Sequence, residues 1–316
     1  MSKYRHKLPQ AGGGLFLSDG GMETSLIYLQ GVELPHFASF VLLKDAEGRG
    51  KLVEYYEKFL PIARARGAGF VLDTATWRAN PDWGRLLGYD LPALKAANEA
   101  SAALALKLRE KWEVPATPIV INGVIGPRGD GYKAGVCEPD EAEEYHSFQI
   151  GVFKETEADM VSAITMNTVN EAIGIARAAR AHGMPCVVSF TVETDGRLAD
   201  GTSLRAAIEA TEEATGASPA YYMINCAHPS HFEHALARGE AWVKRIQGIR
   251  ANASAKSHEE LDNSTELDPG DPVDLSQRYR RLAGSFPQVR VLGGCCGTDH
   301  RHIKAICEAV TPAAAA

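Results

Sequence analysis

Short apolar runs recur along this chain, separated by longer stretches in which apolar residues return every three or four positions. Runs of this kind, bounded by glycine, proline or polar residues, are typical of buried strands. A strand that leads into a helix and then into another strand is the repeating unit of a parallel sheet. We predict strands at 15–18, 69–73, 119–122, 160–165, 186–191, 221–225, 245–251 and 289–292.

The stretches between these runs have the spacing of helices. In the first of them, Leu52, Tyr55, Tyr56 and Phe59 fall on one helical face. We predict helices at 52–66, 98–112, 139–157, 170–182, 203–215, 229–238, 275–284 and 299–310. Eight strands alternating with helices favour an α/β fold with a single (β/α)8 TIM barrel over a doubly wound sheet.

No linker or change of composition divides the chain, so we expect one domain, 1–316. The stretch 253–273 is polar and rich in Ser, Asp, Glu and Pro. We predict a long mobile loop there. It follows the seventh strand, on the face where barrels place their active sites, so a lid is a second interpretation.

Composition and charge exclude several classes of protein. With 45% hydrophobic and 23% charged residues, the chain is an ordinary globular protein. Its net charge of −7 argues against binding to nucleic acid or to an anionic membrane surface. It has no apolar run long enough for a membrane helix, and residues 1–10 lack the apolar core of a secretory signal. Six cysteines without a small disulfide framework suit a reducing compartment, so we expect a cytoplasmic protein.

The most informative candidates for chemistry are the cysteines of the sequence Gly-Gly-Cys-Cys-Gly-Thr at 293–298, together with Cys226. Adjacent residues of a regular strand point to opposite faces, so Cys295 and Cys296 reach one metal only from a turn, and the flanking glycines permit one. In a barrel, Cys226 ends the sixth strand and the pair ends the eighth, which places the three thiols at one mouth. Three thiolates suit Zn²⁺ and leave a fourth position open for a substrate. The alternative is that these cysteines are small buried hydrophobes.

Other polar residues near strand ends are candidates for substrate contact. The segment Asp19-Gly20-Gly21-Met22-Glu23 follows the first strand, and its carboxylates suit an amino group; a tight turn capped by Asp19 is the alternative. We predict these substrate contacts: Asp19, Gly20, Gly21, Met22, Glu23, Thr74, Thr165 and Ser189. His228, His231 and His234 lie close together in sequence, but their spacing turns them around a helix, so we predict no second metal site there.

With these residues placed, the chain resembles the homocysteine S-methyltransferase family over nearly its whole length. The resemblance is carried by Asn225-Cys226 and the turn at 293–298, and more weakly by the segment at 19–24, by 189–191 and by 200–202. It implies a (β/α)8 barrel in which Cys226, Cys295 and Cys296 bind Zn²⁺. One departure is clear: the family's fourth strand usually ends in Glu-Thr, and its Glu helps to hold the substrate's amino group, whereas this chain has Ile164 there.

The expected reaction is methyl transfer from a sulfonium or ammonium donor to a thiol, with homocysteine converted to methionine. In this reaction zinc lowers the pKa of the acceptor's thiol, and the anionic centre favours a cationic donor. Trp77 and Tyr132 could face such a cation, and packing is the favoured alternative for either side chain. The alternatives are a different thiol acceptor, a zinc-dependent lyase or hydrolase, and a zinc-binding protein without catalysis. An anionic three-thiolate centre is a weak Lewis acid, which argues against hydrolysis.

Overall fold

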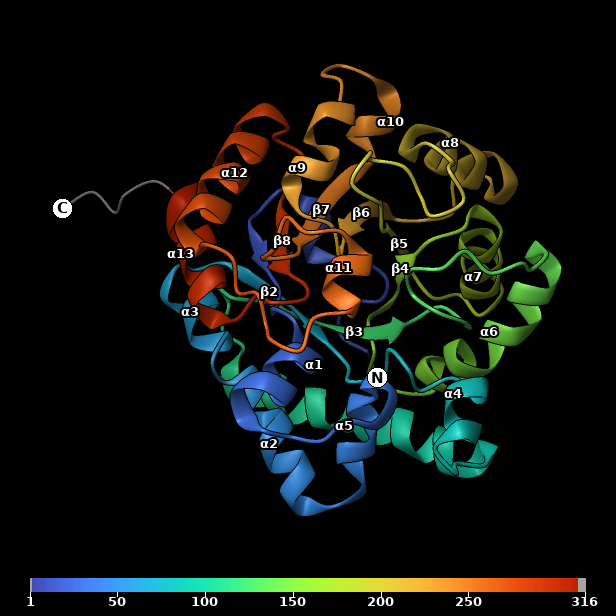
Figure 1. The fold of residues 1–316 in the computed structure, drawn as a ribbon. Helices are drawn as coiled ribbons and strands as arrows, with labels where there is room; N and C mark the ends of the chain where they lie inside the picture. The colour runs from blue at the N-terminus through green and yellow to red at the C-terminus, as the bar shows by residue number, and fades with distance from the viewer. Residues whose placement is uncertain (1, 312–316) are drawn as a thin grey trace.

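Eight parallel strands pair in chain order and close into a barrel, with β1 lying beside both β2 and β8 (Figure 1). The computed structural model describes residues 2–311. Each predicted strand is present, most with small shifts at their ends, so the barrel predicted from the sequence is confirmed. The strands are β1 (Phe16–Leu17), β2 (Gly69–Asp73), β3 (Ile119–Ile125), β4 (Met160–Met166), β5 (Cys186–Phe190), β6 (Tyr221–Asn225), β7 (Ile246–Ala251) and β8 (Val291–Gly294).

The longer helices form a ring outside the barrel, whereas α11 (His258–Asp262) lies in front of its mouth (Figure 1). The helices that connect the strands have very different lengths. They are α1 (Met22–Thr24), α2 (Ala46–Tyr56), α3 (Leu60–Ala65), α4 (Pro81–Leu86), α5 (Leu91–Trp112), α6 (Pro139–Lys154), α7 (Val169–Ala181), α8 (Leu204–Thr215), α9 (Pro229–Phe232), α10 (Ala241–Lys244), α11 (His258–Asp262), α12 (Pro272–Ser285) and α13 (His300–Val310). Single-turn or π-type segments cover Pro9–Gly12, Ser25–Leu29, Pro35–Phe37, Ser39–Lys44 and Glu233–Ala235.

Three predicted helices differ clearly from the structure. The helix predicted over 98–112 begins seven residues earlier, at Leu91, where Asp90 caps α5. The helix predicted over 52–66 is divided into α2 and α3. Pro61 lies at the start of α3, and a proline removes a backbone donor and crowds the carbonyl four residues earlier, so one continuous helix is excluded. The helix predicted over 229–238 ends early, because α9 continues only as a single turn, Glu233–Ala235.

The prediction of a mobile loop over 253–273 was wrong in part. This stretch contains α11, which begins with a capping box between Ser257 and Glu260. In Figure 1, α11 lies in front of the barrel mouth. The loop predicted at this strand end is therefore a cover with its own helix.

Apolar side chains fill the barrel interior toward the amino ends of the strands, and the barrel is open at the carboxyl ends. Phe16, Val71, Val120, Met160 and Val291 belong to an inner apolar cluster that fills the barrel. A larger cluster lies between the strands and the surrounding helices. Because the interior is packed, a ligand enters only at the carboxyl ends of the strands. Within residues 2–311, no helix is both long and apolar enough to cross a membrane.

Candidate active site

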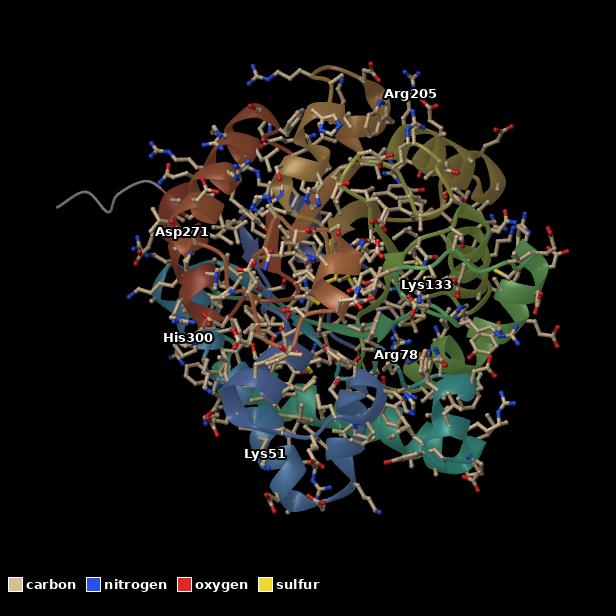
Figure 2. The ribbon with its side chains drawn as sticks, in the orientation of Figure 1. Lys51, Arg78, Lys133, Arg205, Asp271 and His300 are labelled. Carbon is tan, nitrogen blue, oxygen red and sulfur yellow. A yellow bond between two sulfur atoms is a disulfide. The ribbon has the colours of Figure 1, made fainter. Side chains whose placement is uncertain are left out.

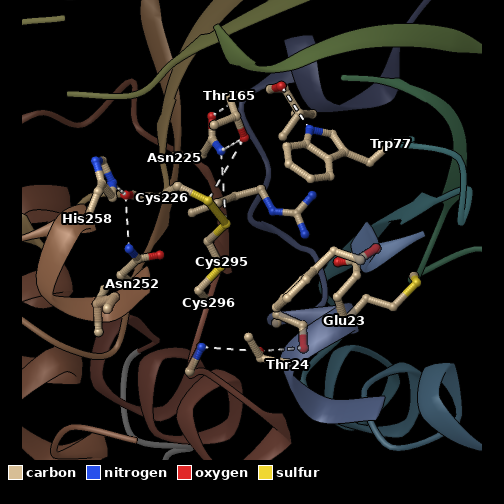
Figure 3. A pocket seen from close by; sticks show the side chains of 18 of the residues that line it. Glu23, Thr24, Trp77, Thr165, Asn225, Cys226, Asn252, His258, Cys295 and Cys296 are labelled. Atoms are coloured by element: carbon tan, nitrogen blue, oxygen red, sulfur yellow. Dashed lines mark hydrogen bonds between the residues drawn. A yellow bond between two sulfur atoms is a disulfide. The ribbon is translucent and has the colours of Figure 1, made fainter. Parts of the chain in front are cut away.

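A cavity of about 250 Å³ opens at the carboxyl ends of the strands. Of the predicted site residues, these line it: Asp19, Gly20, Gly21, Met22, Glu23, Thr74, Thr165, Cys226, Cys295 and Cys296. Ser189 lies outside the lining and is fully buried. Figure 3 shows the cysteines on one side of the cavity, with Glu23 and Trp77 on the other.

The three predicted cysteines meet at this cavity. The Sγ atoms of Cys226, Cys295 and Cys296 all lie within 4.8 Å of one another. A tetrahedral zinc with Zn–S bonds of about 2.3 Å needs sulfur atoms roughly 3.8 Å apart, so the cluster has the right size. Among residues 2–311, no other group of three or more His, Cys, Asp or Glu side chains comes this close, and the histidines at 228, 231 and 234 form no such group.

Two of these cysteines are joined in the structure. Cys226 and Cys295 form a disulfide, and their Cα atoms are 5.3 Å apart. The sequence predicted free thiols, but the turns after β6 and β8 bring the two backbones within the range that a disulfide requires. Reduction of this disulfide would give two free thiols beside the thiol of Cys296. Burial raises the pKa of the Cys296 thiol to about 11, so its thiolate needs a nearby cation at neutral pH.

The glycine turn after β8 packs against the loop after β1. Gly294 donates to the carbonyl of Asp19 at 2.9 Å, and Gly21 donates to the carbonyl of Thr298 at 3.0 Å. A Cβ atom at Gly21 would lie 2.6 Å from the carbonyl oxygen of Cys295. Only glycine permits this approach. The barrel therefore closes with the first loop directly against the cysteine pair.

Cys226 is held by a network around Asn225. The Oδ1 atom of Asn225 accepts from Ser189 at 2.6 Å and from the backbone of Thr165 at 3.0 Å, and its Nδ2 donates to Thr165 Oγ1 at 2.8 Å. Thr165 and Cys226 both have positive φ, 66° and 52°. Such backbone is costly for residues with a Cβ atom and is concentrated at functional sites. Ser189 thus supports the cavity through Asn225.

A buried charge cluster forms the cavity wall beside the thiols. Arg250, at 8% exposure, pairs with Asp73 and with Asp19, whose Oδ1 lies 2.5 Å from Nη2. Tyr55 donates to the other oxygen of Asp19 at 3.0 Å. Burial raises the pKa of Asp19 to about 7, with Arg250 lowering it and Asp73 raising it. Asp19, predicted to hold a substrate's amino group, therefore already has protein partners on both oxygens.

Two side chains that line the cavity, Glu23 and Asn252, each have an oxygen that can still accept a hydrogen bond from a ligand. Ser39 donates to Oε1 of Glu23 at 2.8 Å, which occupies only one carboxylate oxygen. Asn252 donates to the Cys226 carbonyl at 2.9 Å, and its buried Oδ1 has no partner. Ile164, at 7% exposure, presents an apolar surface where a carboxylate was expected from the family resemblance. A ligand with N–H groups would find its acceptors at Glu23 and Asn252.

The cover helix α11 is fastened to the cysteine cluster through His258. Its Nε2 lies 2.5 Å from the carbonyl oxygen of Cys226, and its Nδ1 lies 2.9 Å from Oε1 of Glu193. Tyr132 packs on the His258 ring with centroids 4.3 Å apart, and its hydroxyl lies 3.7 Å from Cys296 Sγ. One side chain therefore links α11, the loop after β5 and the backbone of a candidate metal ligand.

Replacing His258 is expected to release this cover. His258→Ala removes both hydrogen bonds, worth about 1–3 kcal/mol together, so opening of α11 should become roughly 5- to 150-fold more frequent. Amide hydrogen exchange across 257–262 measures this directly. The matched control is Glu259→Ala, an exposed position on the same helix. Equal protection of α11 in wild type and in His258→Ala would show that the histidine does not fasten the cover.

Sequence reasoning missed Arg78, Arg250 and His258 as cavity residues. Arg250 had a weak signal, since it is a charged residue inside an apolar strand. Arg78 lies in a loop, and His258 begins the short helix α11 inside a stretch without periodicity. In neither place does the sequence indicate what the side chain faces. Asn225 was noted only as the neighbour of Cys226.

The fold and the site define a (β/α)8-barrel enzyme whose candidate active site is built around three cysteines at the strand ends. The chain belongs to the homocysteine S-methyltransferase family, whose sequence model matches residues 16–310. The match spans nearly the whole chain and agrees with the resemblance drawn from the sequence.

Individual relatives are distant. Betaine–homocysteine S-methyltransferase 1 of Rattus norvegicus is 23% identical over 269 residues, which cover 78% of this chain and 62% of that protein. The chain thus spans less than two thirds of the relative's length. The oxidized form of the homocysteine methyltransferase MmuM of Escherichia coli has a TM-score of 0.75 at 22% identity, covering 95% of this chain and 97% of that chain. Its metallated form has a TM-score of 0.72 at 22% identity, covering 96% and 98%.

Proposed function

We propose that this protein is a zinc-dependent S-methyltransferase that moves a methyl group from a sulfonium or ammonium donor to the sulfur of homocysteine, giving methionine. The observation that carries the proposal is the meeting of Cys226, Cys295 and Cys296 within 4.8 Å at the cavity. Membership of the homocysteine S-methyltransferase family supports the reaction class and the acceptor.

The donor set fits zinc, because all three groups are sulfur atoms within 4.8 Å of one another and, once the disulfide is reduced, they leave one tetrahedral position for a substrate. Cys226, Cys295 and Cys296 would hold the metal. When bound, zinc would attract the acceptor's thiol and lower its pKa. The disulfide must be reduced for this, so we place the protein in a reducing compartment, the cytoplasm.

The chain's own residues position the reactants. Trp77 and Tyr132 line the cavity and offer aromatic faces to a cationic donor. Glu23 keeps a free acceptor oxygen for the ammonium group of homocysteine, a role that the sequence assigned to Asp19 or Glu23. The helix α11 covers the cavity and excludes water from the reacting groups. A new S–C bond forms as the donor's C–S or C–N bond breaks, and the leaving group departs neutral.

A donor screen tests the proposal. Protein reduced and loaded with equimolar zinc is offered homocysteine with S-methylmethionine, S-adenosylmethionine, a betaine or a thetin, and methionine is measured by mass spectrometry. We expect one donor class to give methionine only when zinc is present. Zinc-loaded protein that forms methionine from none of these donors would contradict the proposal.

A further inference from the structure

Arg78 is a cation on the cavity wall that is held in place by two indole rings. It follows Trp77 in the loop after β2 and lies at the barrel mouth (Figure 2). Its guanidinium carbon is 3.7 Å from the ring centroid of Trp83 and 4.3 Å from that of Trp77. Stacking of this kind fixes the plane of the guanidinium while leaving its edges for hydrogen bonds.

The hydrogen-bonding capacity of Arg78 is largely unused. Nη1 donates to the carbonyl of Gly129 at 3.1 Å, and Nε is buried without a partner. Among the described residues, no carboxylate lies within ion-pair distance of Arg78, whereas the buried Arg109 and Arg250 are both paired with aspartates. Asp130 and Glu23 act on Arg78 only from beyond ion-pair distance. A partly buried cation without a directly paired carboxylate is costly, and an anion that arrives with a ligand would lower this cost.

We propose that Arg78 binds the carboxylate of a substrate, so that the cavity selects carboxylate-bearing molecules. The planar fork of a guanidinium matches a carboxylate with two parallel hydrogen bonds. This inference rests on the proposed function for the identity of the reactants. The carboxylate belongs either to the thiol acceptor, as in homocysteine, or to the methyl donor, as in a betaine. A donor without a carboxylate gains nothing from Arg78.

Binding without turnover provides the first test. Metal-free protein is titrated by calorimetry with glycine betaine and with choline, which has the same ammonium group but no carboxylate. Homocysteine and its decarboxylated analogue homocysteamine form the second pair. We expect Arg78→Met to weaken binding of the carboxylate member of at least one pair about 10- to 100-fold, leaving the other member unchanged. Arg78→Lys should recover part of the affinity, and Arg85→Met, an exposed position on α4, is the matched control.

The two pairs identify the source of the carboxylate. Selective loss with glycine betaine assigns Arg78 to the donor, and selective loss with homocysteine assigns it to the acceptor. Equal affinity of the wild type for both members of each pair, or unchanged affinities in a folded Arg78→Met variant, would overturn the inference. Thermal unfolding confirms that the variant is folded, and Arg78→Lys serves in its place if it is not. Because these titrations need no methyl transfer, a failed donor screen leaves their outcome intact.

Discussion

Each of the substitutions Cys226→Ser, Cys295→Ser and Cys296→Ser is expected to abolish zinc retention and methyl transfer. The three sulfurs lie within 4.8 Å of one another, and under the proposed function each would supply a thiolate ligand that a serine hydroxyl does not replace. Replacing a residue that supports a metal ligand typically weakens metal affinity about 10- to 100-fold. Replacing a ligand itself should therefore weaken zinc affinity by more than about 100-fold. Zinc content after dialysis of the reduced protein, and methionine formation, are the measurements.

The matched control for these variants is Cys137→Ser, since Cys137 is a free, partly exposed cysteine away from the cluster. It should retain zinc and activity at the wild-type level. Full zinc retention in any one of the three cluster variants would remove that cysteine from the ligand set, and full activity as well would end the zinc-dependent hypothesis.

Arg250→Met is expected to destabilise the folded protein by about 3–5 kcal/mol. Arg250 is buried between Asp19 and Asp73, and its removal leaves two carboxylates facing each other without a cation. Burial lowers the pKa of Arg250, but Asp73 and Asp19 raise it further, so the net shift is upward and the guanidinium stays charged. The free energy of unfolding in urea measures the effect.

The destabilisation by Arg250→Met should grow as the pH rises. Asp19 has a folded-state pKa of about 7, above its value in an unfolded chain, so the folded state binds more protons between about pH 4 and pH 7 and loses stability as the pH rises through that range. Without Arg250 the ionised form of Asp19 loses its cation, so the pKa of Asp19 rises further and the loss of stability continues to higher pH. The difference between wild type and variant should therefore be smaller at pH 5 than at pH 8.

Two further variants make the interpretation specific. Combining Arg250→Met with Asp19→Asn and Asp73→Asn removes all three charges and should recover part of the lost stability, because no unpaired carboxylate remains. Arg205→Met removes two exposed ion pairs, to Glu209 and Glu240, and should change stability by less than about 1 kcal/mol. If Arg250→Met unfolds at the same urea concentration as Arg205→Met, the buried charge cluster does not stabilise the fold.

The sequence determined the barrel and the meeting of the cysteines. Apolar runs and helical periodicity reflect local burial, so the strands and most helices were readable without tertiary contacts. Barrel closure then fixes which strand ends are neighbours, and this placed Cys226 beside Cys295 and Cys296. The glycines on either side of Cys295 and Cys296 indicated a turn, because glycine adopts the backbone conformations that such a turn requires.

Only the tertiary structure decided how the cavity is charged and covered. Arg250 bonds to residues 177 and 231 positions away, Arg78 is positioned by Trp83 as well as by its neighbour Trp77, and His258 reaches back to Cys226. No periodicity records such contacts, because a single charged side chain in a strand or loop has the same local sequence whether it faces solvent, a partner or a ligand. Its role depends on which distant groups the closed barrel brings within hydrogen-bonding distance.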